Sequence, residues 1–592
     1  MNIRIENKPP AGTQGTKCHE LMSDGSPCPF EKYSGLLFRD QSHCVFHSNM
    51  VLEKRTDFEK ELRSYVEKIK SDPNIKKFDF TRYIFPEISF QGQQFEKPSI
   101  FLQAKFVGNA DFSRVVFHDQ VNFDSCDLTG GGTFNRAKFL KTIDFSRAEF
   151  GRFWFDEAEF IEESIFKRTK FKDAVDFFNA AFNNGADFSN VVFEQQVSFA
   201  AVTFKGNVVF SNTEFRGRTL FLSTLFRGIS GSVEPNLVDF SEAHFLDEIT
   251  FNKAEFDNEA RFSGVKFEKE VYFYSTMFKG NVDFLAATFN EKTLFAGGGE
   301  TKVFFAECYF PRIRLGKEAT LTFEDVDLSN AVFLDTNIEP FVFRNVSWHE
   351  TRSRKRALLN EFPPIKGNES EGEYESIAEN YRQLVLNYER KRDYEAAEDF
   401  HIGEMEMRRK KLGAGLEIPK WLRESIKFIR STFSWVSISW LGGVYNWLKD
   451  KTIWIKKWVN SYQLYGFLSN YGTSYWRAFG VLMLFVLVFS WFFLYSGIQT
   501  SETRSSGTNE VQVDTIEYDV FQNEDHSFVS LGQWFSDYLL AIQLTMSIIT
   551  FQRERFYEPI GALGRFLLFA AVIVLASQAA LVLLVIRRRF KR

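Results

Sequence analysis

The sequence has few of the residues that build disulfide scaffolds, and it shows no pattern typical of an enzyme active site. Only five of its 592 residues are cysteines, too few for disulfides to carry the fold of so long a chain. No motif places a nucleophile beside a base, so we do not expect an enzyme. The net charge of −5 implies no general attraction to nucleic acid, and we expect no nucleic-acid partner.

The first residues also lack the apolar core of a signal peptide. Residues 1–20 read MNIRIENKPPAGTQGTKCHE, with no run of apolar side chains. We therefore expect the N-terminal bulk of the chain to stay in the cytoplasm, where its cysteines stay reduced.

Three of the five cysteines lie in a polar N-terminal segment, residues 1–50, where they form a C-x9-C-x15-C-x2-H pattern with one histidine. Three thiolates and one imidazole suit a closed, tetrahedral structural zinc site, which leaves no open position for catalysis. The predicted ligands are Cys18, Cys28, Cys44 and His47. His19 and His43 lie nearby as alternative ligands, and reduced thiols without a metal are the other interpretation.

Phenylalanine is the residue in excess, with 70 copies. Between residues 78 and 349 it recurs in two interleaved series with a step of 11, as in Phe177, Phe188, Phe199, Phe210 and Phe221. A small residue often stands two positions earlier, as in Ala186-Asp187-Phe188. Residues two apart point to the same side of an extended segment, so each short segment would bury one large and one small side chain. A helical face would need further apolar residues three and four positions away, where polar residues stand.

This pattern resembles the Phe-rich form of the pentapeptide-repeat family, whose A-D-F-x-x and A-E-F-x-x units it contains. The resemblance implies a right-handed, quadrilateral β-helix over residues 78–349, with phenylalanine inside. The step shortens to ten between Phe145 and Phe155, and we expect the irregular stretch from Arg227 to Asp239 to loop out. A charged helical connector or cap, residues 51–77, precedes the repeats.

A linker, residues 350–373, separates the repeats from a helical C-terminal part. Residues 374–412 show apolar helical faces on both sides of a polar turn and resemble one tetratricopeptide-type helix pair. Such a pair cannot bury its own face, so we expect it to pack on the solenoid end or on another subunit. Residues 413–476 hold seven of the eleven Trp among Lys and Arg, which is typical of helices in the membrane interface.

Two apolar segments, within residues 477–498 and 562–592, are long enough to cross a bilayer as helices. Between them lies an acidic loop, residues 499–529, and basic residues stand before the first span and after the second. The positive-inside rule then predicts a multi-pass protein of the bacterial inner (plasma) membrane, with both termini in the cytoplasm.

The half-apolar segment of residues 530–561 precedes the second span. A short helix and a loop between two spans resemble the pore module of the two-transmembrane potassium-channel superfamily, with matches at Thr550, Phe551 and Pro559. The resemblance implies a re-entrant pore loop and, by analogy, a tetramer. The filter glycines are missing, and their place is taken by Gln552, Arg553, Glu554 and Arg555. Because a potassium filter needs a backbone twist that glycine adopts at low cost, we do not expect potassium selectivity.

The sequence thus predicts a multidomain β + α membrane protein with a cytoplasmic β-helix, a helical hairpin and two transmembrane helices around a re-entrant segment. We expect an oligomeric, ion-channel-like protein whose β-helix senses a stimulus or docks a cytoplasmic protein partner. Its pore could be non-selective or anion-preferring, or stay shut until a partner acts. The alternative is a non-conducting, membrane-anchored interaction scaffold. Gln578, in the middle of the second span, is expected to line the pore or to form an interhelical hydrogen bond.

Overall fold

The computed structural model describes residues 17–32, 40, 42–229, 236–298, 302–352, 354–361, 371–414, 461–500, 515–516, 530–550 and 557–590. The chain divides into two compact units, Met1–Pro364 and Ile365–Arg592. Each unit is described by itself.

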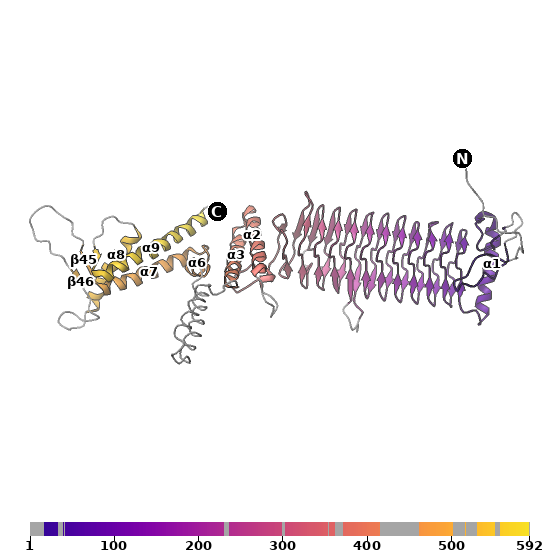
Figure 1. The fold of residues 1–592 in the computed structure, drawn as a ribbon, viewed down its shortest axis with the longest axis horizontal. Coiled ribbons are helices and arrows are strands. Elements are labelled where there is room, and N and C mark those ends of the chain that lie inside the picture. The colour runs from indigo at the N-terminus through magenta and orange to yellow at the C-terminus, as the bar shows by residue number, and fades with distance from the viewer. Residues whose placement is uncertain are drawn as a thin grey trace, which may run out of the picture. The chain divides into compact units, whose positions relative to one another are not determined.

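The first unit contains a β-solenoid of four parallel sheets, drawn in Figure 1 as stacked coils of short strands. Up to β39 (Thr293–Ala296), strands four apart along the chain pair in parallel, one strand per coil in each sheet. Among the last strands the step falls to three or two, because the final coils add no strand to the fourth sheet. The sheets have 12, 11, 12 and 9 strands. They run from β1 (Phe78–Asp79) to β43 (Ala331–Val332), from β2 (Ile84–Phe85) to β41 (Arg314–Leu315), from β3 (Ile88–Ser89) to β44 (Val342–Arg344), and from β4 (Gln94–Phe95) to β36 (Met277–Phe278).

Phenylalanine fills the interior of the solenoid, as the repeat predicts. The ring of Phe177, which is fully buried, stacks between those of Phe155 and Phe199, at centroid distances of 4.7 and 5.1 Å. Buried hydroxyls at the small-residue position donate to carbonyls of the preceding coil, as Thr169 does to Phe145 at 2.8 Å. The predicted β-helix is therefore confirmed as a β-solenoid, while its right hand stays a prediction.

A glycine makes room for an additional ring, Phe153, within the ten-residue step between Phe145 and Phe155. Phe153, in β15 (Phe153–Trp154), is fully buried beside Gly132 of β11 (Gly132–Thr133). A Cβ atom on Gly132 would lie only 2.7 Å from Cζ of Phe153. The absence of a side chain at position 132 therefore makes room for an additional aromatic ring.

The break in the ladder is shorter than the sequence predicts. β28 (Leu225–Arg227) includes Arg227, and β29 (Leu237–Asp239) forms the last three residues of the expected loop. The prediction that Arg227 to Asp239 loops out is wrong at both ends, because Val238 is buried in the interior and restores the ladder. After the last coil, a short 3-10 helix, η1 (Leu359–Glu361), closes the described part of this unit.

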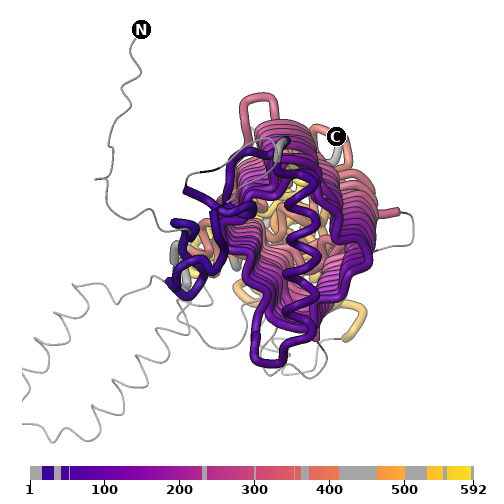
Figure 2. Tube along the Cα trace, turned by 90° about the vertical axis from the view of Figure 1, so that its right-hand side faces the viewer, coloured from indigo at the N-terminus to yellow at the C-terminus, as the bar shows by residue number. Residues whose placement is uncertain are grey.

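A helix covers the start of the solenoid. Figure 2, a view down the axis of the solenoid, shows α1 (Val51–Ser71) lying across the end of the first coil. One face of α1 is buried, and its Phe58 ring meets that of Phe85 edge to face at 5.4 Å. The aromatic interior of the first coil is thereby shielded from water.

The second unit begins with a helical hairpin, α2 (Glu371–Arg390) and α3 (Tyr394–Ala414). The rings of Tyr388 and Phe400 pack at 5.3 Å within it. Residues 415–460, which include most of the Trp- and Lys-rich region, lie outside the described residues. The later elements are α6 (Ser461–Ser469), α7 (Tyr475–Ser496), β45 (Ile498–Thr500), β46 (Thr515–Ile516), α8 (Leu531–Ile549), β47 (Tyr557–Pro559) and α9 (Gly561–Phe590).

Two of these helices are long and apolar enough to cross a membrane. They cover Tyr475–Ser496 and Gly561–Arg587. Ser474 caps the first, since its hydroxyl accepts a hydrogen bond from the amide of Arg477, and Gly497 with φ of 82° ends it. Their positions agree with the two segments that the sequence predicts as spans.

Candidate functional site

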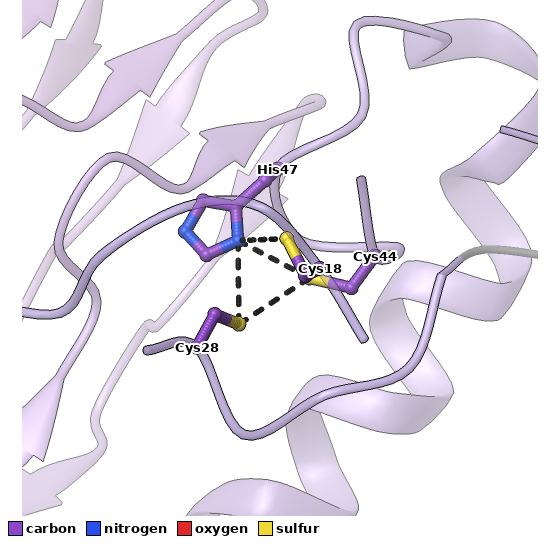
Figure 3. A group of neighbouring side chains, drawn as sticks. All are labelled: Cys18, Cys28, Cys44 and His47. Carbon is purple, nitrogen blue, oxygen red and sulfur yellow. Dashed lines mark hydrogen bonds between the residues drawn. The ribbon is translucent and has the colours of Figure 1, made fainter. Parts of the chain in front are cut away.

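The four predicted metal ligands come together in the N-terminal segment (Figure 3). All four are buried, and their ligand atoms lie within 4.8 Å of one another. His47 Nδ1 is 3.5, 3.7 and 3.2 Å from the Sγ atoms of Cys18, Cys28 and Cys44, respectively. The thiols of Cys28 and Cys44 are 3.9 Å apart.

These distances fit a tetrahedral metal centre. Zinc–sulfur bonds of about 2.3 Å and a zinc–nitrogen bond of about 2.1 Å, at tetrahedral angles, place neighbouring ligand atoms about 3.5–3.8 Å apart. Of the two alternative ligands, His43 is turned away, with its ring nitrogens 3.7 Å from Glu20 and 3.6 Å from Asp40. His19 is not part of the group either. The cluster could therefore hold a metal ion.

Local backbone structure positions each ligand. Cys18 and Cys28 face each other across a hairpin in which Cys18 N donates to Phe30 O and Cys28 N donates to Glu20 O. Cys44 and His47 lie on one tight turn, where His47 N and Ser48 N both donate to Cys44 O. The C-x2-H spacing thus places two ligands on one turn.

The first coil orients the imidazole. His47 Nε2 is 3.0 Å from the carbonyl oxygen of Thr81, to which it donates its proton. In the neutral imidazole, Nδ1 then carries the lone pair that a metal ion would use, on the side of the thiols. A ligating histidine usually donates its other ring nitrogen to such an acceptor, which fixes the tautomer and increases ligand basicity.

The electrostatics of the cluster suit a cation. Hydrogen bonds from Cys28 and Cys44 lower the pKa of Cys18, while contacts with Cys18 and Cys28 raise the pKa of Cys44. The opposite directions show that ionisation of one of these two thiols opposes ionisation of the other, and a bound cation would relieve this repulsion. Burial opposes protonation of His47, but hydrogen bonds with Cys18 and Cys28 raise its pKa to about 9.

One buried residue near the cluster, Lys54 of α1, is not predicted from the sequence. Its Nζ donates to Ser48 O at 2.6 Å, and burial lowers its pKa to about 7 against the attraction of Cys44 and Asp40. Lys54 lies four residues before Phe58 and eight before Leu62, so a helical projection would have placed it on the buried face of α1.

In the second unit, both flanks of α8 pair with the same strand. β45, which follows α7, pairs antiparallel with β46 through Gln499 and Thr515, and with β47 through Gln499 and Glu558. β46 precedes α8 and β47 follows it. The chain therefore leaves this small sheet to form α8 and comes back to it before α9 begins.

α8 packs against both apolar helices. Its buried residues Ala541, Leu544 and Ile548 join a core with residues of α7 and α9. Two polar contacts bind it to α7: Ser490 Oγ lies 2.9 Å from Thr545 Oγ1, and the Tyr538 hydroxyl donates to Leu487 O at 2.8 Å.

The predicted pore residues are only partly within the described residues. Thr550 ends α8 and is exposed, and its hydroxyl donates to Met546 O. Pro559 is buried at the end of β47. The filter-like residues lie outside the described part of the chain: Phe551, Gln552, Arg553, Glu554 and Arg555.

Gln578 takes one of its two predicted roles. It is buried, and its Nε2 donates to Ala478 O in α7 at 2.8 Å and also approaches Leu468 O at 3.4 Å. This is a hydrogen bond between the two apolar helices, and the pore-lining role stays a prediction.

Comparison with known proteins supports the solenoid. The family model for pentapeptide repeats, with nine copies, matches residues 155–203 and 235–277. No curated protein and no solved structure matches the chain. Both matched ranges consist of regular coils, so the central part of this chain is a pentapeptide-repeat β-solenoid.

Proposed function

We propose that the second unit is a pore-loop-type membrane module of a homo-oligomer, and that the solenoid is its cytoplasmic sensor or docking arm. The observation that carries this proposal is the pairing of both flanks of α8 with β45. A segment that leaves and rejoins one end of two apolar helices has the topology of a re-entrant loop. Its loop backbone is tolerated at membrane depth only where protein or a water-filled cavity surrounds it.

The outer face of α8 supports an oligomer. Leu531, Phe535 and Leu539 recur every four residues, and 87%, 58% and 49% of their surfaces are exposed in the single chain. This apolar stripe lies beside the face that packs on α7 and α9. In a homo-oligomer of fourfold symmetry, which the channel analogy implies, neighbouring subunits and lipid cover it.

The residues at the position of a channel's selectivity filter determine the expected selectivity. Arg553 and Arg555 in each subunit would form a ring of positive charge near the conduction path, partly balanced by Glu554. Such a ring repels cations. We therefore propose a pore that is non-selective or prefers anions, with no potassium selectivity.

Planar-bilayer recordings test the channel. The purified full-length chain should pass current in asymmetric KCl. The reversal potential should lie near zero or be displaced towards the chloride equilibrium potential. Arg553→Ala with Arg555→Ala should shift the reversal potential towards cation preference. Arg587→Ala, which removes an exposed charge from the far end of α9, serves as the control and should not. Oligomers that pass no current under any voltage, pH or partner would contradict the proposal.

The second candidate is a non-conducting anchor for an interaction scaffold. The hydrogen bond from Gln578 to Ala478 O favours it, because the polar group of the span is turned to its own protomer. This candidate predicts that the double arginine variant leaves partner binding and oligomeric state unchanged, and that no current is seen with either protein.

For the N-terminal centre, we propose that the metal is zinc. Three thiolates with one imidazole are soft and borderline ligands that suit zinc, and the four-ligand set is closed, as in structural sites. Elemental analysis of protein purified without added metal should give one zinc per chain for the unmodified protein, and little for Cys28→Ser.

A further inference from the structure

We infer that the metal centre closes the open edge of the solenoid, by holding residues 44–47 where an additional coil would otherwise precede β2. This inference rests on the zinc proposal above. It assigns the bound metal ion a specific task, which is to seal the first coil against pairing with other chains.

The backbone of Phe46 takes the place of a coil. Along the second sheet, each coil donates an amide hydrogen to the coil before it: Asp127 N to Ala104 O at 2.9 Å, and Lys105 N to Tyr83 O at 2.8 Å. In the first coil, Ile84 N has no earlier coil to bond. It donates to Phe46 O at 2.8 Å, in the same position and with the same length.

The side chain of Phe46 also packs on the first coil. Its ring stacks on that of Tyr83, with centroids 4.6 Å apart and planes 4° from parallel. Tyr83 stands at the small-residue position, two residues before Phe85, whose own ring stacks on Phe106 of the next coil at 4.4 Å. Phe46 is 1% exposed. It therefore covers the end of the first coil at Tyr83, beside the Phe58 ring of α1 that meets Phe85.

The metal ligands lie on both sides of this residue. Cys44 is two positions before Phe46 and His47 directly follows it, and the His47 ring is tied to the first coil through Thr81 O. The other two ligands, Cys18 and Cys28, belong to the separate N-terminal hairpin. One metal ion would thus cross-link the hairpin, the Phe46 turn and, through His47, the first coil.

The cap helix secures the same turn from the other side. Lys54 of α1 donates to Ser48 O at 2.6 Å and lies near Phe46 O at 3.5 Å. A centre of three thiolates and a divalent ion carries one net negative charge, and the buried ammonium group of Lys54 would balance it. The metal centre and α1 together form one closing unit.

An uncovered edge strand promotes aggregation. Unpaired amides on the edge of a sheet are a template for pairing with another chain, and β-solenoids need polar or covered terminal coils to stay soluble. Loss of the metal should free the Phe46 turn, expose Ile84 N–H, and let solenoids associate through their first coils.

Hydrogen–deuterium exchange on the full-length protein in detergent tests this inference. Compared with the metal-loaded protein, the chelator-stripped protein and Cys28→Ser should each show exchange at least about tenfold faster in peptides covering residues 44–48 and 83–85. Peptides covering residues 177–199, in the middle of the ladder, should not change. Cys126→Ser is the control, because Cys126 is buried in the ladder, donates to Phe101 O and is not one of the four metal ligands.

The outcomes separate the two proposals. If zinc binds, and its removal leaves exchange at Ile84 unchanged, the edge-closing role is wrong while the zinc assignment stands. If the protein holds no metal and residues 44–48 are protected equally in Cys28→Ser, both are wrong. Faster exchange throughout the solenoid would also contradict a role confined to its first edge.

Discussion

Gln578 of α9 donates a hydrogen bond to the main-chain oxygen of Ala478 in α7, across 2.8 Å. At the other end of the same helix pair, Ile498 in β45 pairs with Pro559 in β47. The two contacts hold α7 and α9 as an antiparallel hairpin in one register. A single polar group in an apolar helix thus has an identified partner.

Replacing this group should weaken the hairpin without changing what the module conducts. Gln578→Leu removes the donor and leaves a buried carbonyl with one bond fewer, and we expect a loss of about 1 kcal/mol, typical of interhelical hydrogen bonds in membranes. Thermal unfolding in detergent measures it. Ser577→Ala, at the exposed neighbouring position, should have no effect. Equal midpoints for both variants would show that the hydrogen bond does not stabilise the pair.

Two adjacent phenylalanines provide a matched test of the ladder. Phe177 is fully buried between two stacked rings, whereas 49% of the Phe178 surface is exposed. Phe177→Ala should destabilise the solenoid by about 3–5 kcal/mol through the cavity it leaves, and Phe178→Ala by well under about 1 kcal/mol. Loss of the strand signal in circular dichroism on heating reports both. Similar losses for the two variants would contradict the inward assignment of the repeat.

The pH dependence of the solenoid's stability should reveal a carboxylate that destabilises the folded state when it is ionised. Burial, with the charges of Asp176 and Glu157, raises the pKa of Asp156 from 3.8 to about 6. Between these values the folded state binds more protons than the unfolded state, so stability falls as the pH rises through this window. Asp156→Asn removes that penalty, so it should gain about 1 kcal/mol at pH 7.5, allowing for solvent screening, and little at pH 3.5.

Denaturant unfolding at the two pH values measures this gain. Asp187→Asn is the contrasting variant, because Asp187 pairs with Lys167 at 3.0 Å and loses that ion pair. It should not gain stability at pH 7.5. A less stable Asp156→Asn protein at pH 7.5 would show that the carboxylate is favourably solvated.

The solenoid and the metal cluster could be predicted because residue types alone define them. Phenylalanine at a period of 11 specifies a coil, and the C-x2-H spacing of Cys44 and His47 specifies a ligand turn. The role of Phe46 could not be predicted in this way. Phe46 is not part of the repeat. Its ring reaches the first coil only because the N-terminal segment folds back on Tyr83.

Other features depend on contacts between distant segments. β45, β46 and β47 are two or three residues long, and no alternation of apolar and polar residues marks strands so short. They pair because α7 and α9 bring their ends together. For Gln578, the sequence predicts a polar contact in the span, but the partner carbonyl depends on the register of the two helices.

Labelling of single cysteines on either side of α8 tests the re-entrant topology most directly. Thr515→Cys in β46 precedes α8 and Glu558→Cys in β47 follows it, and the five native cysteines are buried. In intact spheroplasts, a membrane-impermeant maleimide should label both, while Lys141→Cys on the solenoid surface should react only after lysis. Labelling of Thr515→Cys and Glu558→Cys from opposite sides of the membrane would contradict the proposed pore loop.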